Sequence, residues 1–124
     1  MNSLIWIALG GATGATVRFG LQSWFAKLTP DYPLGTTLAN ISGCLLAGMA
    51  LRFLSDMSDM QRHLILTGFL GALTTFSSFS IEVVTLLEKQ RFAAAAWHWS
   101  AGAFVCVGCS LLGYWLMLKT FPQL

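Results

Sequence analysis

The 124-residue chain is 56% hydrophobic and only 10% charged, and its mean hydropathy is +0.68. Because soluble domains carry about a quarter charged residues, this composition predicts a membrane protein. The formal net charge of +2 is too small to indicate a nucleic-acid partner or a polybasic membrane arm.

Four apolar stretches have the length needed to cross a membrane. A hydrocarbon core about 30 Å thick requires about 20 residues of helix. The stretches run over residues 4–25, 34–54, 64–87 and 94–118. The connections between them are short, so neighbouring helices are expected to run antiparallel. We therefore predict an all-α membrane protein with a single four-span domain over residues 1–124.

Small residues recur at helical spacing in these stretches. The first contains a GxxxG pattern at Gly10 and Gly14, and the second has a small residue at every fourth position from Gly35 to Ala47. Such stripes let helix backbones approach closely in lipid. Packing within one bundle accounts for some of them, and their presence on several helices also favours a partner subunit.

Basic residues are divided equally between the two ends of the four spans. One side, with the N-terminus and the second connection, holds Arg52, Arg62 and Lys119, and the other holds Lys27, Lys89 and Arg91. The positive-inside rule reads orientation from a bias in this distribution, and here there is none. Either the orientation in which the chain inserts is only weakly determined, or both orientations are made. A small four-span protein of this kind is a candidate for an antiparallel, dual-topology homodimer.

Two charged side chains lie well inside the spans, away from their ends. Arg18 lies deep in the first stretch, where an ionisable residue indicates a functional site. Snorkelling toward the interface is the alternative, and a third reading is a cation at a water-filled vestibule that attracts anions. Glu82 is an acid well inside the third stretch. It is a candidate partner for a cation, a candidate proton carrier, or a solvated residue near the interface.

The segment from Gly68 to Ser80, GFLGALTTFSSFS, is the least like a purely structural membrane helix. Irregular backbone at membrane depth is tolerated where it is buried in protein or lines a cavity. Gly lowers helix propensity, and the pair Thr74 and Thr75 competes for backbone hydrogen bonds. We therefore predict a broken helix between Gly71 and Thr75. A break frees carbonyls for a cation and aims a half-helix N-terminus, which favours anions, at the same depth.

Polar residues on the second and fourth stretches are further candidates. Asn40 can donate to an anion through its amide NH₂ group, and an interhelical hydrogen bond is the ordinary alternative. Thr36 lies one helical turn before it. His98, between two Trp residues, is expected in an interfacial aromatic belt, with a place beside a pore as the second reading.

Two Phe residues follow the predicted break. Phe76 and Phe79 are three residues apart and share a helix face, with Thr75 and Ser78 on the adjoining face. An aromatic pair at this spacing usually serves only to pack helices together. The electropositive edges of the rings can also stabilise an anion that has shed its water.

Three segments of the chain together resemble one known family. They are GGATGATVRFG from Gly10, GTTLANISG from Gly35 and GFLGALTTFSSF from Gly68. With the matching length and number of spans, the chain resembles the Fluc (CrcB-type) family of small bacterial fluoride channels. The third motif is the distinctive one.

The resemblance implies an antiparallel, dual-topology homodimer with two fluoride pores in the bacterial inner membrane. It implies a structural Na⁺ at the dimer centre, bound by the main-chain carbonyls of Gly71 and Thr74. Fluoride would leave the cell passively, driven by its gradient and the membrane potential. The matching pore residues are Asn40, Phe76 and Phe79, with Arg18 from the first motif and Ser78 where many relatives have Thr. Thr36 and Thr75 complete the expected fluoride pathway.

Two other functions suit a membrane chain of this size. A small multidrug antiporter is also a four-span, dual-topology protein, but it needs a carboxylate in the membrane, typically in the first helix. No Asp or Glu occurs before Asp31, which leaves Glu82 as its one candidate. A structural subunit without transport would leave Arg18, Asn40 and the TTFSSF cluster unexplained. No nucleophile with a base, metal-ligand cluster or phosphate loop is present in the sequence, so an enzyme is not expected.

Overall fold

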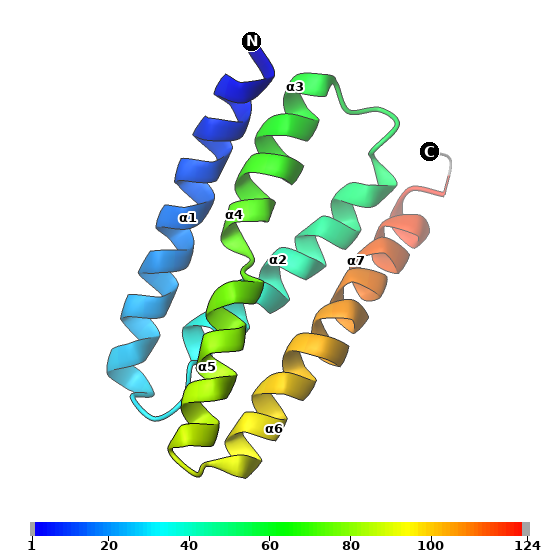
Figure 1. Ribbon diagram of the computed structural model, residues 1–124. Helices are drawn as coiled ribbons and strands as arrows, with labels where there is room; N and C mark the ends of the chain where they lie inside the picture. The colour runs from blue at the N-terminus through cyan, green and yellow to red at the C-terminus, as the bar shows by residue number, and fades with distance from the viewer. Residues whose placement is uncertain (1, 123–124) are drawn as a thin grey trace.

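The computed structural model describes residues 2–122, and this part of the chain forms helices without strands (Figure 1). Helix α1 spans Asn2–Leu28 and α2 spans Leu34–Arg52. The third span consists of α3 (Asp59–Gln61), the π-helical segment η1 (Arg62–Leu70), α4 (Gly71–Leu73) and α5 (Phe76–Glu88). The fourth consists of α6 (Phe92–Ser100), the π-helical segment η2 (Ala101–Val105) and α7 (Cys106–Thr120).

Four helices of the described chain are long and apolar enough to cross a membrane: Ser3–Leu28, Leu34–Arg52, Asp59–Glu88 and Phe92–Thr120. The predicted all-α fold with four membrane-length helices is therefore confirmed. The first, third and fourth helices run beyond the apolar stretches that predicted them. The second ends two residues earlier than predicted, because the backbone leaves the helical conformation at Phe53 (φ −97°, ψ 8°).

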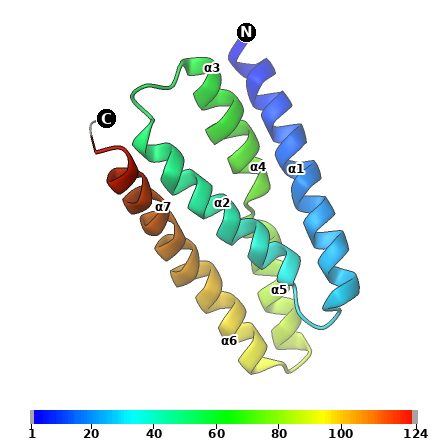
Figure 2. The ribbon, with the colours of Figure 1, turned by 180° about the vertical axis from the view of Figure 1, so that it is seen from behind.

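The connections between the helices are short and locally stabilised. Before α3, Ser58 and Gln61 form a reciprocal capping box, in which the Gln61 N–H donates to Ser58 Oγ at 3.3 Å and the Ser58 N–H to Gln61 Oε1 at 2.9 Å. After α5, Gln90 adopts a left-handed conformation with φ of 56°. Both devices turn the chain back along the bundle, so the N-terminus, α3 and the end of α7 lie at one end of the molecule (Figures 1 and 2).

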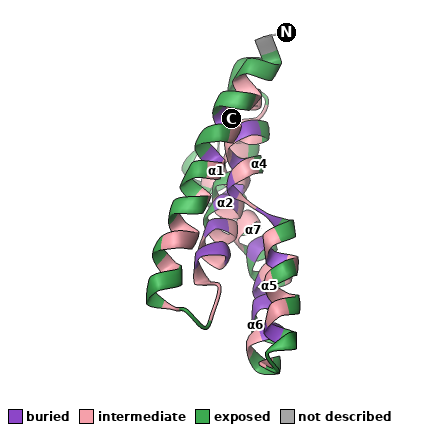
Figure 3. Cartoon of the chain, turned by 60° about the vertical axis from the view of Figure 1, so that its left-hand side comes forward, coloured by how far each residue is buried: buried purple, intermediate pink, exposed green. Residues whose placement is uncertain are grey.

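The third span changes neighbours half-way along its length. Its first half, η1 and α4, packs against α1, whereas its second half, α5, packs against α6. Helix α2 packs mainly against α7, as both faces of the bundle show (Figures 1 and 2). The lower part of α5 and α6 therefore diverges from α1 (Figure 3).

Glycines set the closest helix contacts within the chain. A Cβ built on Gly10 would lie 2.8 Å from the Phe69 nitrogen of η1, and one on Gly14 would lie 3.0 Å from the Leu73 nitrogen of α4. Larger residues would push these helices apart. The GxxxG pattern of the first span is thus used in packing within the bundle.

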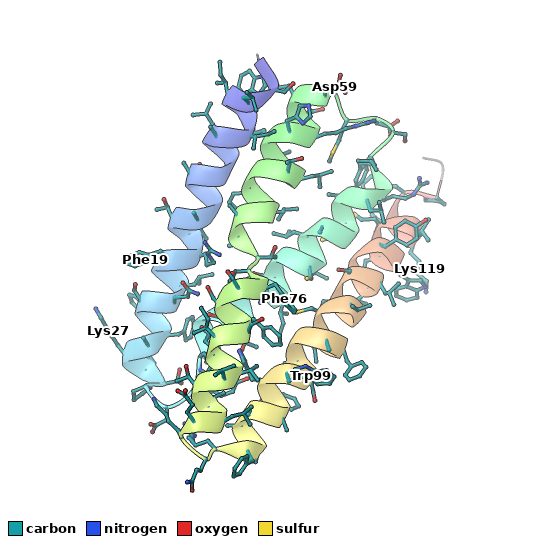
Figure 4. The ribbon with its side chains drawn as sticks, viewed as in Figure 1. Phe19, Lys27, Asp59, Phe76, Trp99 and Lys119 are labelled. Carbon is teal, nitrogen blue, oxygen red and sulfur yellow. The ribbon has the colours of Figure 1, made fainter. Side chains whose placement is uncertain are left out.

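Much of the outer surface is apolar. Exposed side chains include Leu4 (70% exposed) and Phe19 (70%) on α1, Phe104 (69%) on η2 and Leu111 (65%) on α7. Phe19 is labelled on α1 in Figure 4, and the exposed residues cover the outer faces of the helices in Figure 3. Contiguous apolar surface of this kind needs lipid or a partner to cover it.

Candidate functional site

The third span is broken at two consecutive threonines, as the sequence predicted. Thr74 (φ −82°, ψ 149°) and Thr75 (φ −149°, ψ 120°) are both extended, and helix α5 begins at Phe76. Phe76 therefore stands at the break, about half-way along the bundle (Figure 4). Backbone without a helical partner at this depth must find hydrogen bonds elsewhere.

Asn40 of α2 supplies those bonds. The Thr75 N–H donates to Asn40 Oδ1 at 2.7 Å, and Asn40 Nδ2 donates to the Thr75 carbonyl at 3.1 Å. One amide side chain thus pairs with both backbone groups of one extended residue, as a neighbouring β-strand would. This is the interhelical hydrogen bond that the sequence offered as the ordinary alternative. The NH₂ group carries two hydrogens, so the second remains available for another acceptor.

The same contacts release two main-chain carbonyls. In a continuous helix the Thr75 N–H would bond the Gly71 carbonyl, and the Ser78 N–H would bond the Thr74 carbonyl. Here the Thr75 N–H donates to Asn40, and the Ser78 N–H donates to Thr75 Oγ1 at 3.2 Å. Thr75 acts as the N-cap of α5. Gly71 and Thr74, the two residues expected to bind a cation through their carbonyls, have both lost their helical N–H donors.

The two Phe residues differ sharply in exposure. Phe79 is 6% exposed, whereas Phe76 is 80% exposed, and their ring centroids are 5.5 Å apart. Beside them lies a cavity of about 190 Å³, here called the break cavity. It is lined by Asn40, Cys44, Thr74, Thr75, Phe76, Phe79, Gly102 and Cys106. The structure therefore brings five of the predicted residues together in one cavity.

Gly102 of η2 makes room for the Phe79 ring. A Cβ built on Gly102 would lie 2.7 Å from Phe79 Cζ. Because Phe79 is buried, its ring has little freedom to move aside.

A second cavity, of about 460 Å³, lies between the end of α1, the first connection and α5, and is here called the loop cavity. Thr36, Ser78 and Glu82 line it. Ser78 Oγ accepts a hydrogen bond from Thr75 Oγ1 at 3.2 Å, so this residue connects the loop cavity with the break. Arg18 lines neither cavity; it is half-buried on α1 and makes no hydrogen bond or ion pair within residues 3–122.

A chain of hydrogen bonds crosses the bundle beside the loop cavity. Gln22 Nε2 of α1 donates to Thr36 Oγ1 at 2.8 Å, and Thr36 Oγ1 donates to Glu82 Oε1 at 2.5 Å. The other carboxylate oxygen, Glu82 Oε2, lies 3.1 Å from His98 Nε2 of α6. Gln22 was not among the residues predicted from the sequence. Its position four residues after Arg18, on the same helix face, was the available signal.

His98 is buried within this network. It is 1% exposed, while the neighbouring Trp97 (62%) and Trp99 (52%) are exposed. Its Nδ1 lies 3.2 Å from Thr37 Oγ1, and its ring centroid lies 5.1 Å from that of Phe79. The expectation that His98 belongs to an interfacial belt is wrong, because α6 turns this residue toward α2 and α5.

Comparison with known proteins identifies the family. Residues 5–114 match the family described as "CrcB-like protein, Camphor Resistance (CrcB)". The chain is 37% identical over 120 residues to "Fluoride-specific ion channel FluC" of Sulfurovum sp. (strain NBC37-1), covering 95% of each chain. This chain belongs to the CrcB family.

Other CrcB relatives carry the same name. The protein of Pseudomonas paraeruginosa (strain DSM 24068 / PA7) is 45% identical over 115 residues, which is 90% of this chain and 87% of the relative. That of Francisella tularensis subsp. tularensis (strain SCHU S4 / Schu 4) is 34% identical over 125 residues, covering 95% and 96%. The resemblance found in the sequence is thus confirmed. Because these relatives are named ion channels, the expectation that the chain is not an enzyme is confirmed as well.

Proposed function

We propose that this chain is a fluoride-selective, passive ion channel. The observation that carries the proposal is the broken third span, whose backbone is held by Asn40 beside two Phe rings and a small cavity. A sequence identity of 37% to a protein named fluoride-specific ion channel, across 95% of this chain, supports it. The chain is a multi-pass membrane protein with four spans. We place it in the bacterial inner membrane, where it exports fluoride.

The proposed pathway passes the break cavity. Fluoride holds its water strongly, so a pore must replace that water with several donors in a narrow space. The second amide hydrogen of Asn40 is a suitable donor, and the Thr75 hydroxyl becomes one when it turns away from Ser78. The electropositive ring edges of Phe76 and Phe79 complete the set. Ser78 and Thr36 extend the polar route into the loop cavity, and we assign to Arg18 a long-range attraction for the anion.

The working unit we propose is an antiparallel, dual-topology homodimer with two pores. The 80% exposure of Phe76 supports this arrangement, because a pore residue needs a surface opposite it. The equal division of basic residues between the two ends of the bundle supports opposite orientations of the two copies. A second copy would also cover part of the exposed apolar surface.

A structural Na⁺ at the dimer centre fits the chemistry of the break. Neutral main-chain oxygens are ligands for hard cations. The carbonyls of Gly71 and Thr74 have lost their helical donors to Asn40 and Thr75, and Gly71 is exposed. When bound, the ion would supply a fixed positive charge at the break.

The antiporter gains no support from Glu82, because hydrogen bonds from Thr36 and His98 hold this carboxylate.

Growth in fluoride tests the function in cells. A fluoride-sensitive bacterium that expresses this chain is expected to grow at fluoride concentrations that stop the same strain carrying an empty vector. Chloride at the same concentration should make no difference between the two strains. Equal fluoride sensitivity, with the protein present in the membrane, would argue against export.

Gly102→Ala is expected to lower fluoride flux by roughly tenfold with a modest loss of stability. The added methyl group overlaps the Phe79 ring and forces it out of place, and overpacking of this kind costs about 1–3 kcal/mol. Gly108→Ala is the matched control, because no atom lies within 4 Å of a Cβ built on Gly108. Efflux from liposomes measures the difference between the two variants. Equal flux would show that the Phe79 position is not critical.

A further inference from the structure

The hydrogen-bonded pair of Glu82 and His98 has no part in the pathway described so far. Glu82 receives the Thr36 hydroxyl at 2.5 Å and faces His98 Nε2 at 3.1 Å. The side chain of His98 is 2% exposed and that of Glu82 is 24% exposed. A carboxylate at this depth is costly unless it is paired, and in an anion channel it also repels the permeating ion. The pair therefore bears directly on fluoride passage.

The surroundings of His98 suit both of its charge states. In the neutral form, an Nε2–H donates to Glu82 and Nδ1 accepts a hydroxyl hydrogen from Thr37 at 3.2 Å or Tyr32 at 3.4 Å. In the charged form, both ring nitrogens donate and these hydroxyl oxygens accept instead. The Thr37 hydroxyl can then donate to the Pro33 carbonyl, 3.2 Å away. A proton can be gained or lost without leaving a buried polar group unpaired.

The pair adjoins both parts of the proposed pathway. The His98 ring lies against Phe79, with centroids 5.1 Å apart, and Phe79 lines the break cavity. Glu82 lines the loop cavity together with Ser78. A change of one unit charge at the pair therefore changes the electrostatic energy of an anion that moves between the two cavities.

Few other charged groups lie near the pair. Tyr32, from the first connection, contacts His98 directly, and Asp31 and Lys89 line the same loop cavity as Glu82. The α1 residues of that cavity are uncharged, and α2 contributes hydroxyl groups. The Cys106 thiol of α7 shares a pocket with His98. Asp31 and Lys89 have opposite charges, so the net charge beside the loop cavity depends chiefly on the proton carried by the pair.

We propose that Glu82 and His98 form a proton-binding site whose occupancy sets the rate of fluoride passage. This inference rests on the proposed channel function. A proton from water in the loop cavity adds to the pair, and its net charge changes from −1 to 0. Removal of the net negative charge lowers the barrier to an anion. Fluoride flux therefore increases as the pH falls and the pair gains its proton.

The size of the effect follows from simple electrostatics. One unit charge about 10 Å from the anion, at an effective dielectric constant of about 20, changes a rate by roughly tenfold. Acidic conditions on both sides of the membrane would thus give about tenfold faster efflux than pH 8. The coupling is to the equilibrium proton occupancy, so no proton gradient is consumed.

Fluoride efflux from liposomes, with the same pH inside and outside, tests this inference. Protein-free liposomes are measured at each pH, because hydrogen fluoride crosses lipid unaided and its fraction increases in acid. The wild type is expected to show the tenfold increase after this subtraction. His98→Gln and Glu82→Gln are expected to conduct at rates that do not vary with pH. His63→Gln is the matched control and should keep the wild-type profile, because His63 lies on η1, outside both cavities.

Nitrogen-15 NMR of the histidine rings gives a readout that does not depend on transport or on variants. The chain has two His residues, so the two ring signals are assigned by their loss in His98→Gln and His63→Gln. In the wild-type protein, the His98 signal is expected to titrate over the same range as the flux. A wild-type flux that is constant with pH, or a pH profile that survives in folded His98→Gln, would overturn the proton-binding site alone. Absence of fluoride flux at every pH would overturn the channel function, and this inference with it.

Discussion

Fluoride efflux falls by at least about tenfold when Phe76 is replaced by Ile, while the protein stays folded. Phe76 is 80% exposed, and its contact with Phe79 is a tilted one with ring centroids 5.5 Å apart. The substitution therefore leaves the buried core intact, and surface changes of this type alter stability by about 0.5 kcal/mol or less. What it removes is an electropositive ring edge that stabilises the dehydrated anion, and each loss of about 1.4 kcal/mol slows the flux tenfold. Efflux from liposomes measures the loss of conduction, and size-exclusion chromatography checks that the variant stays folded.

Phe104→Ile is the control for this substitution. Phe104 is 69% exposed on η2, and it lines neither the break cavity nor the loop cavity. Loss of an exposed ring at this position should leave fluoride efflux at the wild-type rate. Equal efflux from Phe76→Ile and wild-type protein would remove the Phe76 ring from the mechanism.

Substitution of Asn40 should separate its role as a donor to fluoride from its role in holding the backbone of Thr75. Asn40→Ala leaves the N–H and the carbonyl of Thr75 without partners, at a cost of about 1–3 kcal/mol for each buried group. The Thr75 N–H is then free to bond the Gly71 carbonyl again. Asn40→Asp keeps an oxygen acceptor for the Thr75 N–H but has no donor for fluoride, and it adds a negative charge. We expect both variants to lose fluoride efflux, by about a hundredfold or more for Asn40→Asp.

The two Asn40 variants should differ in their response to Na⁺. Binding to the folded state raises stability by about 2.7 kcal/mol at a hundred times the dissociation constant. The thermal midpoint in Na⁺, relative to K⁺, should increase for wild type and Asn40→Asp and stay unchanged for Asn40→Ala. Ser42→Ala is the control, because the Ser42 hydroxyl bonds carbonyls of its own helix. Wild-type efflux and Na⁺ response in Asn40→Ala would contradict the role given to Asn40.

The sequence predicted the main features of the fold for local reasons. Four apolar stretches of membrane length, separated by short polar connections, specify four antiparallel helices. The break was predictable because Gly71, Thr74 and Thr75 all disfavour a continuous helix. The π-helical turns of η1 and η2 had no recognisable signal, since the glycines they contain also occur in the regular helices α1 and α2, and the π geometry depends on packing.

The site was predictable in its members but less so in their contacts. Asn40 was a candidate from its place in the second span, yet its partner is the backbone of a residue 35 positions away. Local sequence patterns do not show whether Asn40 bonds the backbone or an anion. The pairing of Glu82 with His98 had a usable signal. Glu82 lies six residues before the last residue of α5 and His98 six residues after the first of α6, so a tight helical hairpin brings them together.

Efflux of two anions from the same liposomes tests directly whether this chain is a fluoride-selective channel. The purified protein is reconstituted into liposomes loaded with both fluoride and chloride, and ion-selective electrodes follow the efflux of each anion. We expect rapid loss of fluoride with chloride retained, without a proton gradient. Retention of fluoride, or loss of both anions at similar rates, would contradict it.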